Sequence, residues 1–209
     1  MLAAQAEVGP VPVDEEGLIV IAGKKLAPHA RLISVTPSHQ YPLGVTMSLS
    51  RRLELLEWAK NASAWILEDD YDSEFWYEGR PVEAMQGLDA AEQVIYVGTF
   101  SKVLFPSLRL GYLIVPESLV PPLAALKFLM DTHAPTFEQE VLAEFIAGGH
   151  FERHVRRARA RNAARRMAML QAFTETFGDS VEIDGENAGI HMVVWLRDVA
   201  EKDLPDLIE

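Results

Sequence analysis

The sequence predicts an α/β fold whose sheet mixes parallel and antiparallel strands. Short β-branched and aliphatic runs alternate with helical patterns, which is typical of layered α/β domains. The chain between the strands expected at 94–97 and 110–115 contains Pro106 and no helical pattern. It is too short for a helical crossover, so these two strands should be antiparallel neighbours. We therefore expect an α/β/α layered sheet over about residues 1–150 and a small α+β portion from about residue 151.

Apolar runs and helical periodicity place the other elements. The expected strands are 32–35, 64–67, 94–97 and 110–115, and the expected helices are 48–61, 117–131, 135–149 and 150–177. In the first helix Leu49, Leu53 and Leu56 repeat at helical spacing, and Ser48 or Ser50 is a suitable N-cap. Residues 181–196 are typical of two further strands, joined at Asp184–Gly185.

Composition excludes several classes of site. The formal net charge of −12 argues against nucleic acid as a partner of this segment, because phosphate binding needs a basic surface. There is no cysteine, which excludes disulfides, thiolate zinc sites and cysteine nucleophiles. Neither a signal peptide nor an apolar run of about 18 residues is found, so no membrane contact and a cytoplasmic location are expected.

The helix at 150–177 carries many arginines, which are Arg153, Arg156, Arg157, Arg159, Arg161, Arg165 and Arg166. They suit either an anion or DNA surface or an ordinary solvated helix face interleaved with alanine. The acidity of the whole chain favours the solvated face.

An acidic run, Glu68–Glu74, directly follows an apolar strand. A calcium loop starting at Asp70 is excluded, because Phe75 stands at its glycine position and Pro81 at its final carboxylate position. A magnesium site stays open from the residues alone, although neither GxxxxGK[ST] nor GxGxxG occurs in the chain.

A second polar group follows the next strand. Lys102 comes just after it, with the hydroxyl residues Thr99 and Ser101 beside it, and Arg109 lies seven residues further on. Ligands of open α/β sheets bind at the carboxyl ends of strands, so these residues and the acidic run point to one site. A lysine there suits Schiff-base chemistry, and an arginine suits a phosphate clamp.

The segments TPSHQYPLG, LEDDYDSEFWY and YVGTFSKVLFPSLRLGYLIVP resemble the aminotransferase-like domain of MocR-type regulators of the GntR family. The resemblance runs from about Val11 to Leu196. It implies a three-layer α/β/α large domain of the aspartate-aminotransferase fold (fold-type I, class I/II, dependent on pyridoxal 5′-phosphate, PLP). Residues 1–150 would form part of that large domain. Residues 151–209 would form the long helix and the start of the C-terminal small domain.

The resemblance also implies roles for single residues. Lys102 resembles the catalytic lysine that carries PLP as a Schiff base. Asp69, which lies 102 − 69 = 33 residues earlier, resembles the aspartate that pairs with the pyridine nitrogen. Tyr71 resembles the tyrosine that bonds the phenolic oxygen of the cofactor. A carboxylate beside the ring nitrogen keeps it protonated, and the protonated ring is an electron sink.

The remaining cofactor residues come from the same comparison. Thr99, Ser101 and Arg109 lie where the family binds the phosphate. Gln40, together with His39, lies where related enzymes place an asparagine near the phenolic oxygen. No metal ligand is implied.

The family pattern also has parts that this chain does not show. These are the DNA-binding domain, a glycine-containing phosphate loop, an aromatic residue that stacks on the ring and a C-terminal arginine for the substrate carboxylate. Arg197 comes too early to be that arginine. We therefore expect a segment truncated at both ends, which is inactive and prone to aggregate on its own.

Three functional readings follow from the resemblance. The first is the effector-sensing domain of a MocR-type regulator, which binds PLP and a small amine or amino acid, dimerises in the full-length protein and reaches DNA only through an N-terminal domain. The second is a class I/II aminotransferase, and the third an inactive remnant of either. The wording EDDYDSEF and SHQYPLG favours the regulator.

Overall fold

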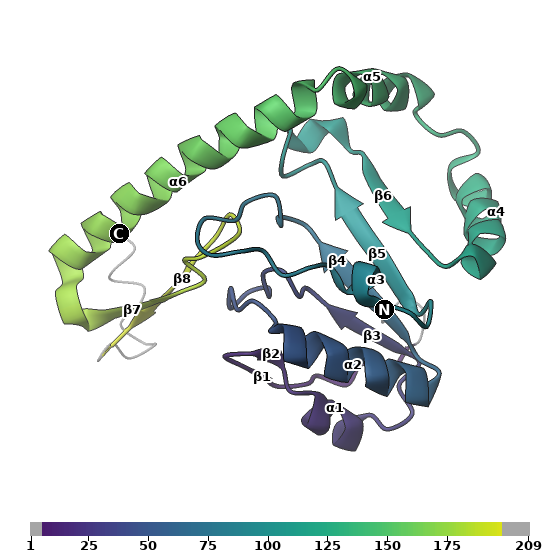
Figure 1. Ribbon diagram of the computed structural model, residues 1–209, viewed down its shortest axis with the longest axis horizontal. Coiled ribbons are helices and arrows are strands. Elements are labelled where there is room, and N and C mark those ends of the chain that lie inside the picture. Colours follow the sequence, from purple (N-terminus) through teal and green to yellow (C-terminus); the bar gives the residue numbers. More distant parts are fainter. Residues whose placement is uncertain (1–5, 198–209) are drawn as a thin grey trace.

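A computed structural model describes residues 6–197, and Figure 1 shows its ribbon. Its centre is a four-stranded sheet in the order β3-β4-β5-β6, with β3 at Leu32–Val35, β4 at Trp65–Asp70, β5 at Val94–Thr99 and β6 at Gly111–Ile114. The first three strands are parallel, and β6 runs antiparallel to β5. The antiparallel pairing expected from the short connection is confirmed.

Strands β4 and β5 run further than their apolar cores predict. β4 continues through Glu68 to Asp70, although carboxylates usually end a buried strand. Glu68 is fully buried because its two oxygens accept the amides of Met85 and Gln86, at 2.8 and 2.9 Å. These bonds satisfy the first turn of α3, Met85–Leu88, so Glu68 is a structural cap.

One face of the sheet carries helices and the main core. This layer contains α1 at Val20–Leu26, α2 at Leu49–Ala62 and the short α3. Ser48 is the N-cap of α2, as expected, because its side chain accepts the amide of Arg51. A core of buried side chains joins these helices to the sheet, and it includes Val20, Ile33, Val35, Met47, Leu55, Trp58, Ile66, Met85 and Val94.

The buried face of α2 differs from its leucine repeat. Leu49 and Leu53 are 49% and 50% exposed, whereas Leu55 is fully buried. The second stripe of the helix, which includes Trp58, faces the sheet instead. The repeat predicted the helix correctly but not its orientation.

Arg52 lies on the buried face of α2 and is fully enclosed. Its guanidinium donates to the carbonyls of Met47, Glu83 and Pro37, at 3.0, 2.9 and 2.8 Å. Burial lowers its pKa, and the nearby carboxylate of Glu68 opposes that shift. Arg52 therefore joins α2 to the loops that follow β3 and precede α3.

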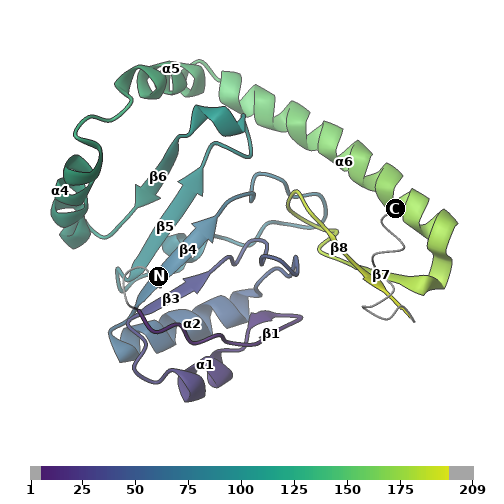
Figure 2. The same cartoon turned by 180° about the vertical axis from the view of Figure 1, so that it is seen from behind.

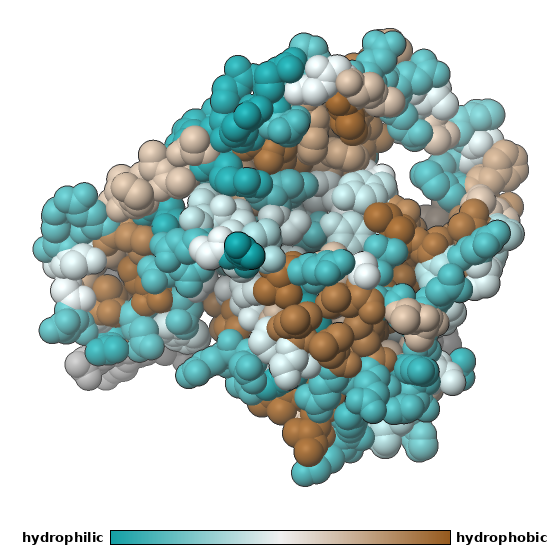
Figure 3. Space-filling view, in the orientation of Figure 1, coloured by the Kyte–Doolittle hydropathy of each residue, from teal (hydrophilic) through white to brown (hydrophobic). Residues whose placement is uncertain are grey.

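The region beyond β6 has little cover. It contains α4 at Val120–Asp131 and α5 at Thr136–Ala147, and every residue of β6 is exposed. No residue of α4 is buried. Figure 3 shows hydrophobic side chains gathered over β6 and α4, and these include Tyr112, Leu113, Ile114, Leu126, Phe128, Leu129 and Met130.

The long helix α6 spans His150–Phe177, as predicted, and arches away from the sheet toward a separate hairpin (Figure 2). The hairpin pairs β7 at Val181–Asp184 with β8 at Val193–Leu196. Residues 185–192 form the connection, which is longer than the junction expected at Asp184–Gly185.

Some of the α6 arginines form hydrogen bonds or ion pairs with the segment that follows β4. Arg159 donates to the carbonyl of Glu74 at 2.8 Å, and Arg166 pairs with Glu78 at 2.9 Å. These bonds hold α6 against the segment after β4. The division into residues 1–150 and 151–209 stays a prediction, and residues 198–209 lie outside the described part.

A small N-terminal hairpin pairs β1, Val13–Asp14, with β2, Gly17–Leu18. Three 3₁₀ turns, at Pro106–Leu108, Glu117–Leu119 and Gly178–Ser180, complete the elements. Within residues 6–197, no helix has the length and apolar character needed to cross a membrane.

Candidate functional site

The predicted site residues lie at the carboxyl ends of β4 and β5. The two strands are parallel neighbours, and Asp70 is opposite Gly98. Tyr71 after β4 and Thr99 at the end of β5 are therefore at the same edge of the sheet. This edge is where ligands bind in open α/β folds.

The carboxylates of the acidic run have different partners. Glu68 caps α3, and Asp70 accepts the hydroxyls of Ser73 and Tyr96, both at 2.6 Å. Asp72 bonds His39, at 3.0 Å. Among the described residues Asp69 has no such partner, and it is exposed on the opposite face of β4 from Glu68 and Asp70.

The electrostatic setting of Asp69 suits a positively charged ligand. Partial burial raises its pKa, and the nearby charges of Asp70 and Asp72 raise it further. The ionised Asp69 carboxylate is unfavourable beside these two like charges, so it should bind a cation such as a protonated ring nitrogen.

Tyr71 is half-buried beside this group. Its hydroxyl donates to the carbonyl of His39 at 2.8 Å. Burial raises its pKa well above the ordinary value, with the charges of Asp72 and Asp69 adding to the effect. Tyr71 is therefore a neutral donor with one proton to give.

The residues after β5 offer hydroxyls and two cations. The Thr99 Oγ1 atom accepts the amide of Ser101 at 3.1 Å, which fixes the turn before Lys102. Lys102 and Arg109 are both exposed, and neither has an ion pair with another described residue. Arg109 has a φ of 52°, an uncommon left-handed backbone for a residue other than glycine.

Gln40 serves its own loop. Its side chain donates to the carbonyl of Tyr41 at 2.6 Å and accepts the amide of Leu43 at 3.0 Å. His39, by contrast, is buried and turned toward Asp72. The proposed place of Gln40 and His39 near a phenolic oxygen stays a prediction.

A cavity of about 540 Å³ lies elsewhere, between α6 and the loop at 185–192. Its lining includes Tyr77, Asn162, Arg165, Arg166 and Glu186. None of the eight predicted site residues lines this cavity. His191 does line it, and the His191 ring also lies beside the ring of His39. The expectation that Asp69, Tyr71, Lys102 and Arg109 line one pocket therefore stays a prediction.

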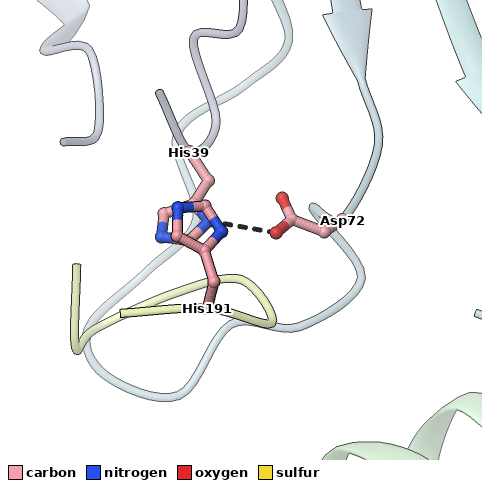
Figure 4. A group of neighbouring side chains, drawn as sticks. All are labelled: His39, Asp72 and His191. Carbon is pink, nitrogen blue, oxygen red and sulfur yellow. Dashed lines mark hydrogen bonds and ion pairs between the residues drawn. The ribbon is translucent and has the colours of Figure 1, made fainter. Parts of the chain in front are cut away.

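The structure also groups three residues that the sequence did not connect. His39, Asp72 and His191 offer donor atoms that all lie within 4.8 Å of one another (Figure 4). Hydrogen bonds engage Nδ1 of His39, Oδ2 of Asp72 and Nε2 of His191. Asp72 stood within the acidic motif, but no sequence signal pointed to His191.

The donor set at the strand ends fits PLP. An exposed lysine and an arginine without ion pairs in the described chain lie near two hydroxyl residues, which suits a phosphate and an aldehyde. Asp69, an unpartnered carboxylate near the end of β4, suits the ring nitrogen. Tyr71, a neutral phenol directly after β4, suits the phenolic oxygen.

Comparisons with known proteins agree with this chemistry. The family model described as aminotransferase class I and II matches residues 23–206. The chain is 42% identical over 204 residues to the probable rhizopine catabolism regulatory protein MocR of Rhizobium meliloti, covering 98% of this chain and 41% of that protein. It is 41% identical over 192 residues to the uncharacterized HTH-type transcriptional regulator YdeL of Bacillus subtilis (strain 168), covering 92% and 41%.

Among solved structures, kynurenine aminotransferase of Pyrococcus horikoshii, in complex with PMP, is similar. Its TM-score is 0.84 at 32% identity, covering 93% of this chain and 50% of that one. The chain thus spans about two fifths of the regulators and half of the enzyme. Its fold is the fold-type I aminotransferase fold, and its curated relatives include MocR-type regulators. The chain belongs to the aminotransferase class I and II family.

Proposed function

We propose that this chain is the PLP-binding, effector-sensing domain of a MocR-type transcriptional regulator. The observation that carries the proposal is the polar group at the ends of β4 and β5, where Asp69, Lys102 and Arg109 have no ion pair with another described residue and Tyr71 lies beside them. The identity with regulators of this type supports the regulatory role. The effector would be a small amine or amino acid.

Different residues of the chain would bind different parts of the cofactor. Arg109, Thr99 and Ser101 would bind the phosphate, and Asp69 would hold a proton on the ring nitrogen. Tyr71 would turn its hydroxyl proton from the His39 carbonyl to the phenolic oxygen. Lys102 would supply the amine that faces the cofactor aldehyde. PLP, when bound, supplies an aldehyde for reversible amine capture and an electron-withdrawing ring.

Titration with PLP of the protein that includes this chain together with its flanking reading frame tests the cofactor part. Binding through Lys102 should give a near-visible absorbance band, which Lys102→Ala should abolish. Lys102→Arg should not restore the band, because a guanidinium stays protonated and cannot act as the amine. Lys127→Ala, which changes an exposed lysine on α4, should keep it. A band that persists in Lys102→Ala would place the bond elsewhere.

A second candidate function is amino-group transfer by a class I/II aminotransferase. The similarity to kynurenine aminotransferase favours it. The two functions separate in a protein that includes any upstream reading frame. A regulator should carry a winged helix-turn-helix there, and PLP with amines should change its DNA affinity; an aminotransferase should turn over an amino acid and a keto acid instead.

A further inference from the structure

Asp72 occupies an unusual position at the edge of the candidate site. Its Oδ2 atom accepts a hydrogen bond from His39 Nδ1 at 3.0 Å (Figure 4). The same atom accepts a second hydrogen bond, also at 3.0 Å, from the amide of Ile190. The side chains of His39 and Asp72 are each only 1% exposed. Because Asp72 and Ile190 are 118 residues apart, the carboxylate joins distant parts of the chain.

The segment 187–191 lies closely against the loops that follow β3 and β4. The Gly189 amide donates to the Phe75 carbonyl at 2.7 Å, and the Tyr77 hydroxyl donates to the Gly189 carbonyl at 2.9 Å. His191 Nε2 bonds the carbonyl of Pro42 at 3.1 Å. Asp72 is the only side chain among the described residues whose carboxylate bonds both this segment and the loop that contains His39.

Gly189 shows how close the contact is. Its φ is 74°, and a Cβ there would come within 1.9 Å of His39 Nδ1 and 2.5 Å of Asp72 Oδ2. Only glycine allows this approach. The backbone of the hairpin loop is therefore fitted against the His39–Asp72 pair itself.

The pair also reaches Tyr71. The carbonyl of His39 accepts the Tyr71 hydroxyl at 2.8 Å, so the His39 loop holds the Tyr71 side chain in place until its hydroxyl turns to a ligand. His39 is held by Asp72 on one side, and its Nε2 atom has no partner among the described residues. With Nδ1 carrying the proton, the bond to Asp72 is the only hydrogen bond of the ring within the described part of the chain.

We infer that Asp72 is a positioning residue that fixes the Tyr71 hydroxyl through His39 and holds the hairpin loop 187–191 against the same site. Its role toward the cofactor rests on the proposed function, while its hold on the loop does not. Occupancy of the cofactor site and the position of the C-terminal hairpin are coupled through this one carboxylate.

Matched substitutions separate donor loss from loss of bulk. Asp72→Leu keeps the branched shape but removes the oxygen that accepts the imidazole and amide donors. Asp72→Asn is the milder control, because its amide oxygen can accept both donors while its NH2 group takes the place of Oδ1, which has no partner among the described residues. His39→Leu keeps bulk without a donor, whereas His39→Asn keeps an N–H near the Nδ1 position. Tyr71→Phe provides the reference for loss of the hydroxyl.

Amide hydrogen exchange, measured on the full chain without cofactor, reports how firmly the loop 187–191 is held. Asp72→Leu and His39→Leu should speed amide exchange across 187–191 by about tenfold or more, because local opening becomes easier. His39→Asn should stay closer to the wild type. Unchanged exchange in Asp72→Leu and His39→Leu would overturn the hold on the loop.

The absorbance band of bound PLP tests whether Asp72 positions the Tyr71 hydroxyl. A hydroxyl donor stabilises an ionised ring oxygen, so its loss raises the pH at which the band titrates. Asp72→Leu and His39→Leu should shift this midpoint upward, as Tyr71→Phe does but by less, and His39→Asn should restore it. An unshifted midpoint would overturn the positioning role.

Two further outcomes are distinct. A wild-type protein that includes the flanking reading frame and gives no band refutes the proposed function, and the exchange measurement then decides the remaining half of the inference. If Zn²⁺ added after chelation slows exchange at 187–191 in the wild type but not in Asp72→Asn, the three donors are metal ligands and the hydrogen-bond role is wrong.

Discussion

Helices α2 and α4 show how differently two regions of this molecule use apolar residues. α2 contains five charged residues in its fourteen, and it buries Arg52, Leu55, Trp58 and Ala59 against the sheet. α4 is much more apolar, yet none of its residues is buried. The burial of a segment therefore follows from what lies opposite it rather than from its own composition.

The difference locates the stability of the described chain. The layer of α1, α2 and α3 has a continuous core, whereas β6, α4 and α5 present their apolar side chains outward. Substitutions in the first region should be costly, and substitutions in the second should change association instead of folding.

Arg52→Met should give the largest loss of stability. It removes donors from three carbonyls, two of them in buried hydrogen bonds, and leaves Glu68 without its nearby cation. We expect about 3 kcal/mol or more, measured by denaturant unfolding. Arg156→Met, on the exposed face of α6, is the control and should change little. A similar loss in both variants would show that the buried network contributes nothing special.

Leu55→Ala and Leu129→Ala compare the two regions directly. Leu55 is fully buried and Leu129 is 78% exposed. The first should lower the free energy of unfolding by about 2–5 kcal/mol, and the second by less than about 0.5 kcal/mol. Equal losses in the same denaturant series would mean that α4 is covered in solution, for example by a second copy of the chain.

Self-association should depend on α4. Replacement of Phe128 and Met130 by lysine adds charge to the exposed apolar face and should reduce light scattering by the isolated chain several-fold at equal concentration, with stability changed by less than about 0.5 kcal/mol. Met167→Lys, at an exposed position of the arginine-rich α6, should leave scattering unchanged. An effect of Met167→Lys as large as that of the α4 variant would place the contact elsewhere.

Sequence patterns predicted the elements well but not their faces. The strands, the antiparallel turn at Pro106 and the full length of α6 follow from local signals. Leu55 and Trp58 lie three residues apart, as do Leu53 and Leu56, so periodicity alone could not choose the buried face of α2. Glu68 also could not be foreseen as buried, because its partners are the amides at the start of α3.

The site shows the same limit. The motif residues from Asp69 to Tyr71 and from Thr99 to Lys102 meet at one sheet edge, because parallel neighbours end together. The bond between Asp72 and Ile190 spans 118 residues and depends on where α6 delivers the hairpin. Nothing in local sequence carries that information.

Asp69→Asn should give the smallest effect, with a sign set by its raised pKa. A carboxyl whose folded pKa lies above its unfolded value of 3.8 destabilises the fold once ionised, so its penalty is absent below pH 3.8 and grows as the pH rises through the folded pKa. Asp69→Asn should therefore match the wild type at pH 3.5 and be slightly more stable at pH 7.

The gain at pH 7 should stay below about 0.5 kcal/mol, because Asp69 is exposed enough for water to screen it. Denaturant unfolding at both pH values measures the difference. Added PLP should reverse the order at pH 7, since a protonated ring nitrogen would turn the unfavourable charge into a paired one. A wild type that is more stable than Asp69→Asn at pH 7 without PLP would mean that the carboxylate already has a counter-ion, and that the unpartnered charge at the end of β4 is no mark of a ligand site.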